Sequence, residues 1–355
     1  NREGEIVFKL DEYDYTTTCR VAQYFYEHEE DEEIILQTHS RGKGINLVFL
    51  GDGFNAENIS NGDYLRVMNE QMERFFDIEP YRTYRDYFNV STAIAVSQES
   101  GIGTVNTIRR TKFETTFAGG VGLRGDYSAI FDYAMKVSSV DESNLNQSLI
   151  IVTPNTIDYG GITEMWEDGS AIAFCPLSED TYPYDARGII QHEAGGHGFG
   201  KLGDEYIYHN GFIEFCCPLD FATLNYGKSL GWYENLSLTG KMHEVPWSHL
   251  IFDDRYSDVV DIYEGGFKHA RGVFRSEQNS CMNNNISYFS AISREAIVKR
   301  IMEYAGESYS FEKFVENDKR DAVNSLSRSA ERLGVTVRGN QYAPRIHKGK
   351  PDILK

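Results

Sequence analysis

The sequence predicts an α/β domain built on a twisted, mainly parallel sheet, and three observations lead to this fold class. Continuous apolar runs, typical of strands buried on both faces, alternate along the chain with segments of helical periodicity. Such alternation is typical of parallel strands joined by helices that cover the sheet. The chain has 355 residues, 41% of them apolar and 25% charged, so it is long enough for one large domain or two ordinary ones.

The strands of this sheet are expected from their apolar runs. Three runs are long and apolar enough for buried strands: residues 45–50 (INLVFL), 88–96 (FNVSTAIAV) and 148–153 (SLIIVT). A shorter run at 169–177 ends at Pro176. We expect this run at the edge of the sheet, because proline is tolerated there.

Two helices are expected between these strands. Apolar residues recur at helical spacing in residues 63–78, and Pro80 stops that helix. Residues 126–139 are expected to form the second helix, with Asp126 as its N-cap.

The two ends of the chain differ from this α/β pattern. Residues 1–40 combine a short apolar start with the acidic run EHEEDEE, which predicts a linker or the remnant of an N-terminal β domain. Residues 41–340 are expected to form the main domain. Beyond residue 207 the pattern is irregular until a helical C-terminal subdomain, with helices predicted at 290–306 and 310–334 and an extended, basic tail with a final strand at 341–355.

The net charge of −19 limits the partners of the protein. Nucleic acid and anionic membranes both demand a basic face, so neither is expected to bind, and the acidity is best explained by solubility. Acidic residues also bind calcium, but the sequence has no Asp-x-Asp-x-Asp-Gly loop to support a structural Ca²⁺ site. No apolar run approaches the roughly 20 residues of a membrane helix, so membrane insertion is not expected.

The five cysteines give no metal-binding or disulfide pattern. There is no Cys-x-x-Cys pair, so a structural zinc knuckle is not expected. Cys216 and Cys217 are adjacent and are not expected to pair with each other. The sequence begins at Asn1 rather than Met, so we expect a processed protein that is secreted, periplasmic or on the cell surface. The oligomeric state is not predicted.

One glycine motif is a weak indication of nucleotide binding. Residues 120–125 fit the pattern Gly-x-Gly-x-x-Gly. A dinucleotide site needs this motif directly after a strand within a βαβ unit, and only a weak strand precedes it here. We therefore expect a glycine-rich loop before a helix, and no binding of ATP or NAD.

The stretch IIQHEAGGHGFGKLGDEY, residues 189–206, carries the side chains of a metal site. A hydrolytic zinc site needs three protein ligands, an open position for water and a carboxylate that accepts the proton of that water. His192 and His197 supply two imidazoles, and Glu193 has the side chain of a general base. The glycines that follow allow a turn, after which Asp204 and Glu205 offer carboxylates for the third position.

The spacing of the two histidines is unusual for one metal. In a regular helix, at about 100° per residue, residues five apart differ by roughly 140° and lie on nearly opposite faces. A π-bulge would align them, because its hydrogen bonds join residues five apart, and Gly195 and Gly196 make such a distortion easier. Alternatively, the helix breaks at this glycine pair and His197 reaches back from a loop. The plainest alternative is that both histidines are ordinary polar residues.

A methionine in polar surroundings adds a second indication. Met282 lies in RSEQNSCMNNN, a polar turn just before a long predicted helix. A single methionine is usually core filler, but a turn of this composition is an unusual place for one.

The segments HEAGGHGFGKLGDEY, FRSEQNSCM and LVFLGDGF together resemble the bacterial immunoglobulin-A peptidase family of zinc metallopeptidases, over roughly residues 40–305. The resemblance implies a zincin fold of the metzincin-like type, with residues 41–340 as the catalytic domain, and one Zn²⁺. It also implies the roles of the site residues: His192, His197 and Asp204 as zinc ligands, Glu193 as general base, Met282 as the methionine of a turn beneath the metal, and Glu205 and Tyr206 as supporting or transition-state residues. The extra residue between the histidines departs from the usual spacing.

The expected function is that of a zinc-dependent endopeptidase. Metal-activated water would attack a peptide bond of a protein or peptide substrate, with Glu193 as general base. The strand at 170–174 is expected to line the cleft and pair with an extended substrate. Immunoglobulin cleavage is not implied for this chain. The alternative is a non-catalytic zincin-like module for surface binding or glycan adhesion.

Overall fold

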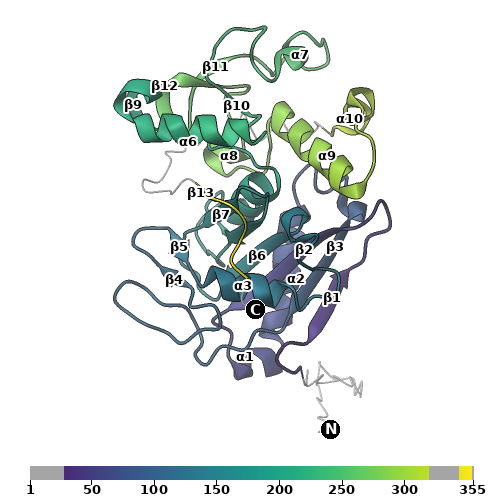
Figure 1. Ribbon diagram of the computed structural model, residues 1–355, viewed down its shortest axis with the longest axis vertical. Helices are drawn as coiled ribbons and strands as arrows, with labels where there is room; N and C mark the ends of the chain where they lie inside the picture. The colour runs from purple at the N-terminus through teal and green to yellow at the C-terminus, as the bar shows by residue number, and fades with distance from the viewer. Residues whose placement is uncertain (1–27, 320–343, 354–355) are drawn as a thin grey trace, which may run out of the picture.

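The computed structural model describes residues 28–319 and 344–353, arranged as a sheet lobe below a smaller upper lobe (Figure 1). The main sheet has seven strands in the order β1-β3-β2-β6-β8-β7-β13. Neighbours are parallel except for two pairs, β1 with β3 and β7 with β8. The bounds are β1 Glu33–Gln37, β2 Ile45–Asp52, β3 Phe88–Ala93, β6 Leu149–Pro154, β7 Ile162–Trp166, β8 Ala171–Phe174 and β13 Arg345–His347. The predicted mixed α/β class is confirmed.

The central strands bury alternate side chains on opposite faces of the sheet. Leu47 and Phe49 of β2 pack with α2 (Asp63–Phe76), whereas Val48 and Leu50 pack with α3 (Tyr127–Ala134). Every residue of β2 is buried, as its continuous apolar run predicts. The result is three layers, with helices on both faces of the sheet.

Both predicted helices of this lobe form, and both end earlier than predicted. α2 ends at Phe76, well before Pro80. The Asp126 side chain accepts a hydrogen bond from the Ala129 amide at 3.0 Å, so it caps α3 as predicted. After Ala134 the chain continues in isolated turns rather than in regular helix.

The prediction of an edge position for residues 169–177 is wrong. They form β8, which pairs with β6 on one side and with β7 on the other. Pro176 lies beyond the last paired residue of β8, so it places no constraint on the ladder. The strand β7 was not predicted, because its short sequence ITEMW includes the buried Glu164. The predicted final strand is confirmed as β13, which pairs with β7.

The upper lobe contains the irregular part of the sequence. It has a four-stranded sheet that packs near α5 (Ile213–Cys216) and α6 (Pro218–Ser229). The strands of this sheet are β9 (Ile207–Phe212), β10 (Leu236–Ser237), β11 (Tyr263–Gly266) and β12 (Lys268–Arg275). The predicted helix at 290–306 is confirmed as α9, Ala291–Ala305. The helix predicted at 310–334 begins as α10, Phe311–Asn317, and residues 320–343 lie outside the described part. The remaining short helices are α1 Ala56–Ser60, α4 Ala186–Ile190, α7 Ser248–Ile251 and α8 Cys281–Asn284.

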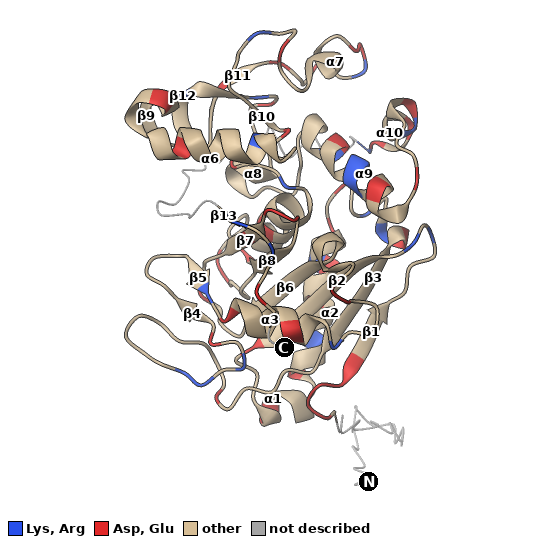
Figure 2. Ribbon diagram, viewed as in Figure 1, with Lys and Arg blue, Asp and Glu red and all other residues tan. Residues whose placement is uncertain are grey.

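The N-terminal part of the chain is described only from residue 28. The strand β1 falls within the segment predicted as a linker or remnant, and it joins the main sheet through β3. The domain boundaries stay a prediction. Figure 2 shows acidic and basic residues spread over both lobes rather than gathered on one element. Among the described helices, none has the length and apolar character needed to cross a bilayer.

The glycine motif at 120–125 is part of a small antiparallel hairpin. β4 (Thr116–Phe117) pairs with β5 (Leu123–Arg124), and the motif spans the turn and the second strand. A dinucleotide site requires a parallel βαβ unit, so this geometry does not support nucleotide binding.

Candidate metal centre

The two histidines lie on a π-helix. The Asp185 side chain accepts from the Gly188 amide at 2.9 Å and caps α4, which passes directly into the π-helix η3, Gln191–Phe199. The Gly200 amide donates to the Gly195 carbonyl at 3.0 Å, a bond between residues five apart. Of the open alternatives, the structure therefore has the π-helical distortion and not a break at the glycine pair.

Three potential ligand atoms meet at one point. Nε2 of His192 and Nε2 of His197 are 3.0 Å apart, and Oδ1 of Asp204 lies 3.2 Å and 3.1 Å from them. A tetrahedral zinc ion with bonds of about 2.0–2.1 Å separates its ligand atoms by about 3.3 Å. The three atoms are therefore spaced as ligands of one ion, and all three side chains are buried.

The hydrogen bonds of the imidazoles favour a cation at this point. Nδ1 of His192 lies 2.9 Å from the Cys281 carbonyl, and Nδ1 of His197 lies 2.8 Å from the Leu202 carbonyl. A carbonyl only accepts, so both Nδ1 atoms carry hydrogen, and in the neutral form that binds a metal both Nε2 atoms present lone pairs. These lone pairs face each other and the Asp204 carboxylate, whose Oδ2 has no hydrogen-bond partner among the described residues. A bound cation turns this repulsion into coordination.

The pKa shifts of Asp204 and Glu193 are consistent with a metal centre at this point. Burial alone raises the pKa of Asp204, but without a metal the charge and the hydrogen bonds of the imidazoles in their protonated form outweigh it and hold that pKa well below its usual range. Burial raises the pKa of Glu193 to about 7, and the Asp204 charge adds to this against opposing effects of His192 and Thr163. The Thr163 hydroxyl lies 2.9 Å from Oε2 of Glu193. Within Gln191–Gly200, Glu193 is partly buried and all the other residues are buried.

Met282 packs directly against the distorted helix. It lies in α8, where the Ser280 hydroxyl oxygen accepts from its amide at 3.1 Å. A Cβ at Gly196 would lie 2.2 Å from the Met282 sulfur, so this contact requires glycine at 196. The structure thus brings the polar turn predicted from the sequence against the helix that carries the histidines.

Glu205 and Tyr206 occupy different surroundings. Glu205 accepts from the Ser280 hydroxyl at 2.5 Å and from the Asn235 amide group at 2.9 Å, and its own amide donates to the Met282 carbonyl at 2.8 Å. It therefore joins the ligand segment to the turn of Met282. The Tyr206 ring stacks on the ring of His192 at 6.5 Å, and its buried hydroxyl has no partner among the described residues.

Comparison with known protein families adds a match to this geometry. The family model described as IgA Peptidase M64 matches residues 34–219, which is more than half of the chain. The chain belongs to this family. It is therefore a peptidase, a hydrolase, and membership implies a metal. None of the curated proteins matches the chain.

The M64 match covers most of the metal centre. It includes the π-helix with both histidines, Glu193, and the segment with Asp204, but it stops before Met282. The resemblance seen in the sequence is confirmed at the level of the family. Details specific to metzincins are not tested by this match.

Sequence reasoning missed side chains that hold the site from distant segments. Thr163 belongs to the unpredicted β7. The Tyr81 hydroxyl donates to the Gly195 carbonyl at 2.6 Å and so anchors the π-helix. Asn235 binds the backbone of Gly203 as well as Glu205. No local pattern marks any of the three, because each acts only through its place in the fold.

The expectation that the strand at 170–174 pairs with an extended substrate is wrong. Both edges of β8 are occupied by β6 and β7, so no extended peptide can pair with it. The outer edge of β7 is itself covered, since the Gly161 amide donates to the Val121 carbonyl and the Glu167 amide to the His347 carbonyl, each at 3.0 Å.

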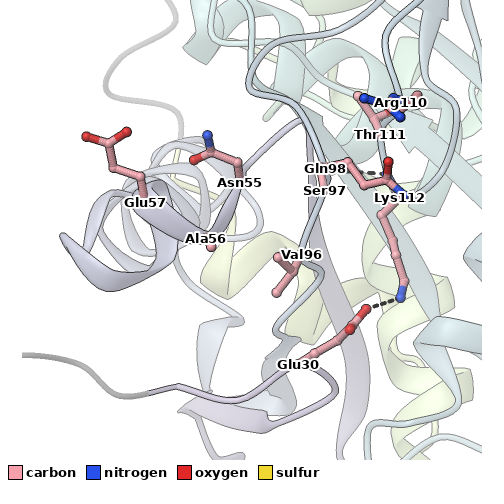
Figure 3. Close-up of a pocket in the computed structure, with 10 residues that line it drawn as sticks. All are labelled: Glu30, Asn55, Ala56, Glu57, Val96, Ser97, Gln98, Arg110, Thr111 and Lys112. Carbon is pink, nitrogen blue, oxygen red and sulfur yellow. Dashed lines mark hydrogen bonds and ion pairs between the residues drawn. The ribbon is translucent and has the colours of Figure 1, made fainter.

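A groove of about 690 Å³ lies instead between α6, β12 and the start of β13, lined among others by Leu219, Tyr226, Phe267 and Ile346. One of its lining residues, Phe267, donates through its amide to the Asp204 carbonyl at 2.7 Å, but the two histidines, Glu193 and Asp204 do not line the groove. A second cavity, of about 730 Å³, lies near α1 at the opposite end of the sheet lobe from the upper lobe. Its Lys112 and Glu30 pair with each other, as Figure 3 shows, and none of its lining residues belongs to the metal centre.

Proposed function

We propose that this peptidase is a zinc-dependent endopeptidase, with His192, His197 and Asp204 as zinc ligands and Glu193 as general base. The observation that carries the proposal is the convergence of three acceptor atoms within 3.0–3.2 Å of one another, on the same π-helical segment as the Glu193 carboxylate. The geometry supports one bound ion at this point.

The donor set favours zinc over the commoner hard cations. Calcium and magnesium take oxygen ligands, whereas two imidazoles and one carboxylate are typical of catalytic zinc with an open fourth position. Both imidazoles are oriented by backbone carbonyls through their other nitrogen, as is usual for metal-bound histidine. Copper, iron and nickel also accept imidazole, so metal analysis is part of the test below.

The proposed chemistry divides between the ion and the chain. When bound, zinc supplies Lewis-acid activation of water and of the peptide carbonyl. Glu193 accepts the proton of the attacking water and passes it to the departing amine. Thr163 orients the Glu193 carboxylate through its hydroxyl, and the buried carboxylate of Asp204 stays ionised.

The proposed substrate is a protein or peptide, with the groove between α6, β12 and β13 as the proposed binding surface for its side chains. This groove has an apolar lining that includes Leu219, Phe267 and Ile346, so it suits apolar side chains of the substrate. The geometry identifies a peptide bond as the reacting group but no particular protein.

We also propose that the enzyme acts outside the cytoplasm, as a secreted, periplasmic or cell-surface protein. The description of its family names immunoglobulin A, an extracellular protein, as the substrate class of the family. Cell fractionation followed by immunodetection tests this location, and a wholly cytoplasmic signal would contradict it.

Metal analysis and peptide-library proteolysis test the activity together. Glu193→Gln is expected to keep the metal but lose about 10²–10⁴-fold in kcat, because only the proton acceptor is removed. His197→Ala is expected to lose both metal and activity. If the wild-type protein binds no zinc at these residues and cleaves no peptide, the chain is instead a non-catalytic zincin-like binding module.

A further inference from the structure

A second cluster of metal-binding side chains lies in the upper lobe, away from the proposed catalytic zinc. Cys216 and Cys217 stand at the junction of α5 and α6, and His269 belongs to β12. One ligand atom of each of the three lies within 4.8 Å of the others. Sγ of Cys216 is 3.4 Å from Nδ1 of His269.

We propose that these three residues bind a structural zinc ion, distinct from the ion at the catalytic centre. Thiolate and imidazole are the ligands that structural zinc prefers, and hard cations such as calcium avoid sulfur. Bonds of about 2.3 Å to sulfur and about 2.0–2.1 Å to nitrogen give a tetrahedral S–N separation of about 3.6 Å. The observed 3.4 Å is close to this value.

The hydrogen bonds of His269 prepare its imidazole for a metal. Nε2 lies 2.9 Å from Oδ2 of Asp220, and because this carboxylate accepts, Nε2 carries the hydrogen. The lone pair of Nδ1 then faces Cys216. A carboxylate behind the imidazole is the usual support for a metal-bound histidine. Oδ1 of Asp220 is held in turn by Lys268 at 3.3 Å.

The backbone of β9 passes close to the cluster. A Cβ at Gly211 would lie 3.0 Å from Cβ and 3.1 Å from Sγ of Cys216, so glycine lets β9 pass close to the thiol. The ring of His209, also on β9, has its centroid 5.2 Å from that of His269. His209 lies near the cluster but is not among the residues whose ligand atoms meet within 4.8 Å, so a water molecule would take the fourth position.

The position of the cluster gives the ion a structural role. It would join the α5–α6 junction to β12 at His269. The residues just before His269 hold the catalytic ligand segment, since Phe267 and Lys268 donate through their amides to the carbonyls of Asp204 and Tyr206 at 2.7 Å and 2.9 Å. An ion at His269 therefore stiffens the strand that supports Asp204. This inference does not depend on the proposed catalysis.

Metal stoichiometry of purified full-length protein, prepared under reducing conditions, tests the inference. We expect two zinc ions per chain in the wild type, one in the double variant Cys216→Ser/Cys217→Ser, and one in His192→Ala. Cys175→Ala is the matched control, because it removes a thiol outside the cluster, and it should keep both ions. A single zinc in the wild type that survives in the double variant would overturn the second site without affecting the catalytic proposal.

Cobalt substitution distinguishes the two sites even where a variant folds poorly. Among the ligands proposed here, only the second site has thiolates, so only it gives an intense near-ultraviolet thiolate-to-cobalt band. We expect this band in wild type and in His192→Ala, and its loss in Cys216→Ser/Cys217→Ser and in His269→Ala. A wild type without the band, or one whose mass and thiol titre show a Cys216–Cys217 disulfide, would refute the site.

Discussion

Thr163 acts on the proposed general base although the two residues are far apart in sequence. Its hydroxyl lies 2.9 Å from Oε2 of Glu193 and 2.9 Å from the Glu193 backbone carbonyl. Thr163→Val keeps the shape of the side chain and removes the hydrogen bond. We expect kcat to fall about 10–100-fold with little change in KM, as for other residues that orient a catalytic group. Steady-state kinetics measure both.

Thr163→Ser is the matched control for this prediction. It keeps the hydroxyl, so it should restore most of the activity, while the zinc content of both variants stays that of wild type. A valine variant with wild-type kcat would show that Glu193 is held by other contacts.

Glu277 predicts a pH dependence of stability that does not involve the metal ligands. Burial raises its pKa to about 7 against the opposing charge of Arg294, and it accepts hydrogen bonds from the Tyr288 hydroxyl and the Ala291 amide. The unfolded chain has the lower pKa, about 4.5, so the folded state holds more protons between pH 4.5 and 7. The contribution of Glu277 to stability is present below about pH 4.5 and is lost as the pH rises through about 7.

The variant Glu277→Gln isolates this effect. Glutamine fills the same space and does not titrate, so urea unfolding at pH 5 and pH 7.5 should show a smaller loss of stability for the variant than for wild type. Equal losses in both proteins would assign the pH dependence to other groups.

The π-helix and the turn that carries Met282 pack closely against each other at Gly196. Met282 is fully buried, and its sulfur occupies the space that a side chain at residue 196 would need. Gly196→Ala therefore forces overpacking, which we expect to cost about 1–3 kcal/mol in the free energy of unfolding. Urea denaturation measures this cost directly.

A double-mutant cycle with Met282→Ala tests whether that contact is the cause. In the Met282→Ala background the added methyl group meets empty space, so Gly196→Ala should cost less there than in wild type. If the two changes are simply additive, the cost comes from the helix backbone and not from the methionine.

The sequence predicted those elements whose signals are local. The strand β2 and the N-cap of α3 follow from a continuous apolar run and a single Asp. The five-residue spacing of His192 and His197 argued against convergence on a regular helix, and the glycine pair between them only allowed the π-helical alternative that the structure has. β7 could not be found in this way, because Glu164 interrupts its apolar pattern and is buried only through partners on α3 and β13. The cluster at Cys216 was missed because its histidine, His269, lies 53 residues further along the chain.

At the scale of the whole molecule, the metal centre lies where the sheet lobe meets the upper lobe. The π-helix packs on β7 and β8 of the main sheet. Asp204 follows it in the chain and binds through its backbone to Phe267, at the start of β12 in the upper lobe (Figure 1). An ion bound to both histidines and to Asp204 therefore ties one lobe to the other.

This geometry predicts that removing the catalytic zinc destabilises the whole fold and not only the site. A ligand at 100 times its Kd stabilises by about 2.7 kcal/mol. With an unfolding entropy of about 2.1 cal/mol/K per residue, each kcal/mol shifts the Tm of a chain of 355 residues by about 1.3 °C. We therefore expect a chelator to lower Tm by about 3–4 °C. The Cys216→Ser/Cys217→Ser background isolates this effect, because the proposed structural zinc is absent there. Adding Asp204→Asn in that background should abolish the response to chelator, since the remaining ion has lost its anionic ligand. If the triple variant still responds as strongly as its parent, the stabilising metal is bound somewhere other than His192, His197 and Asp204.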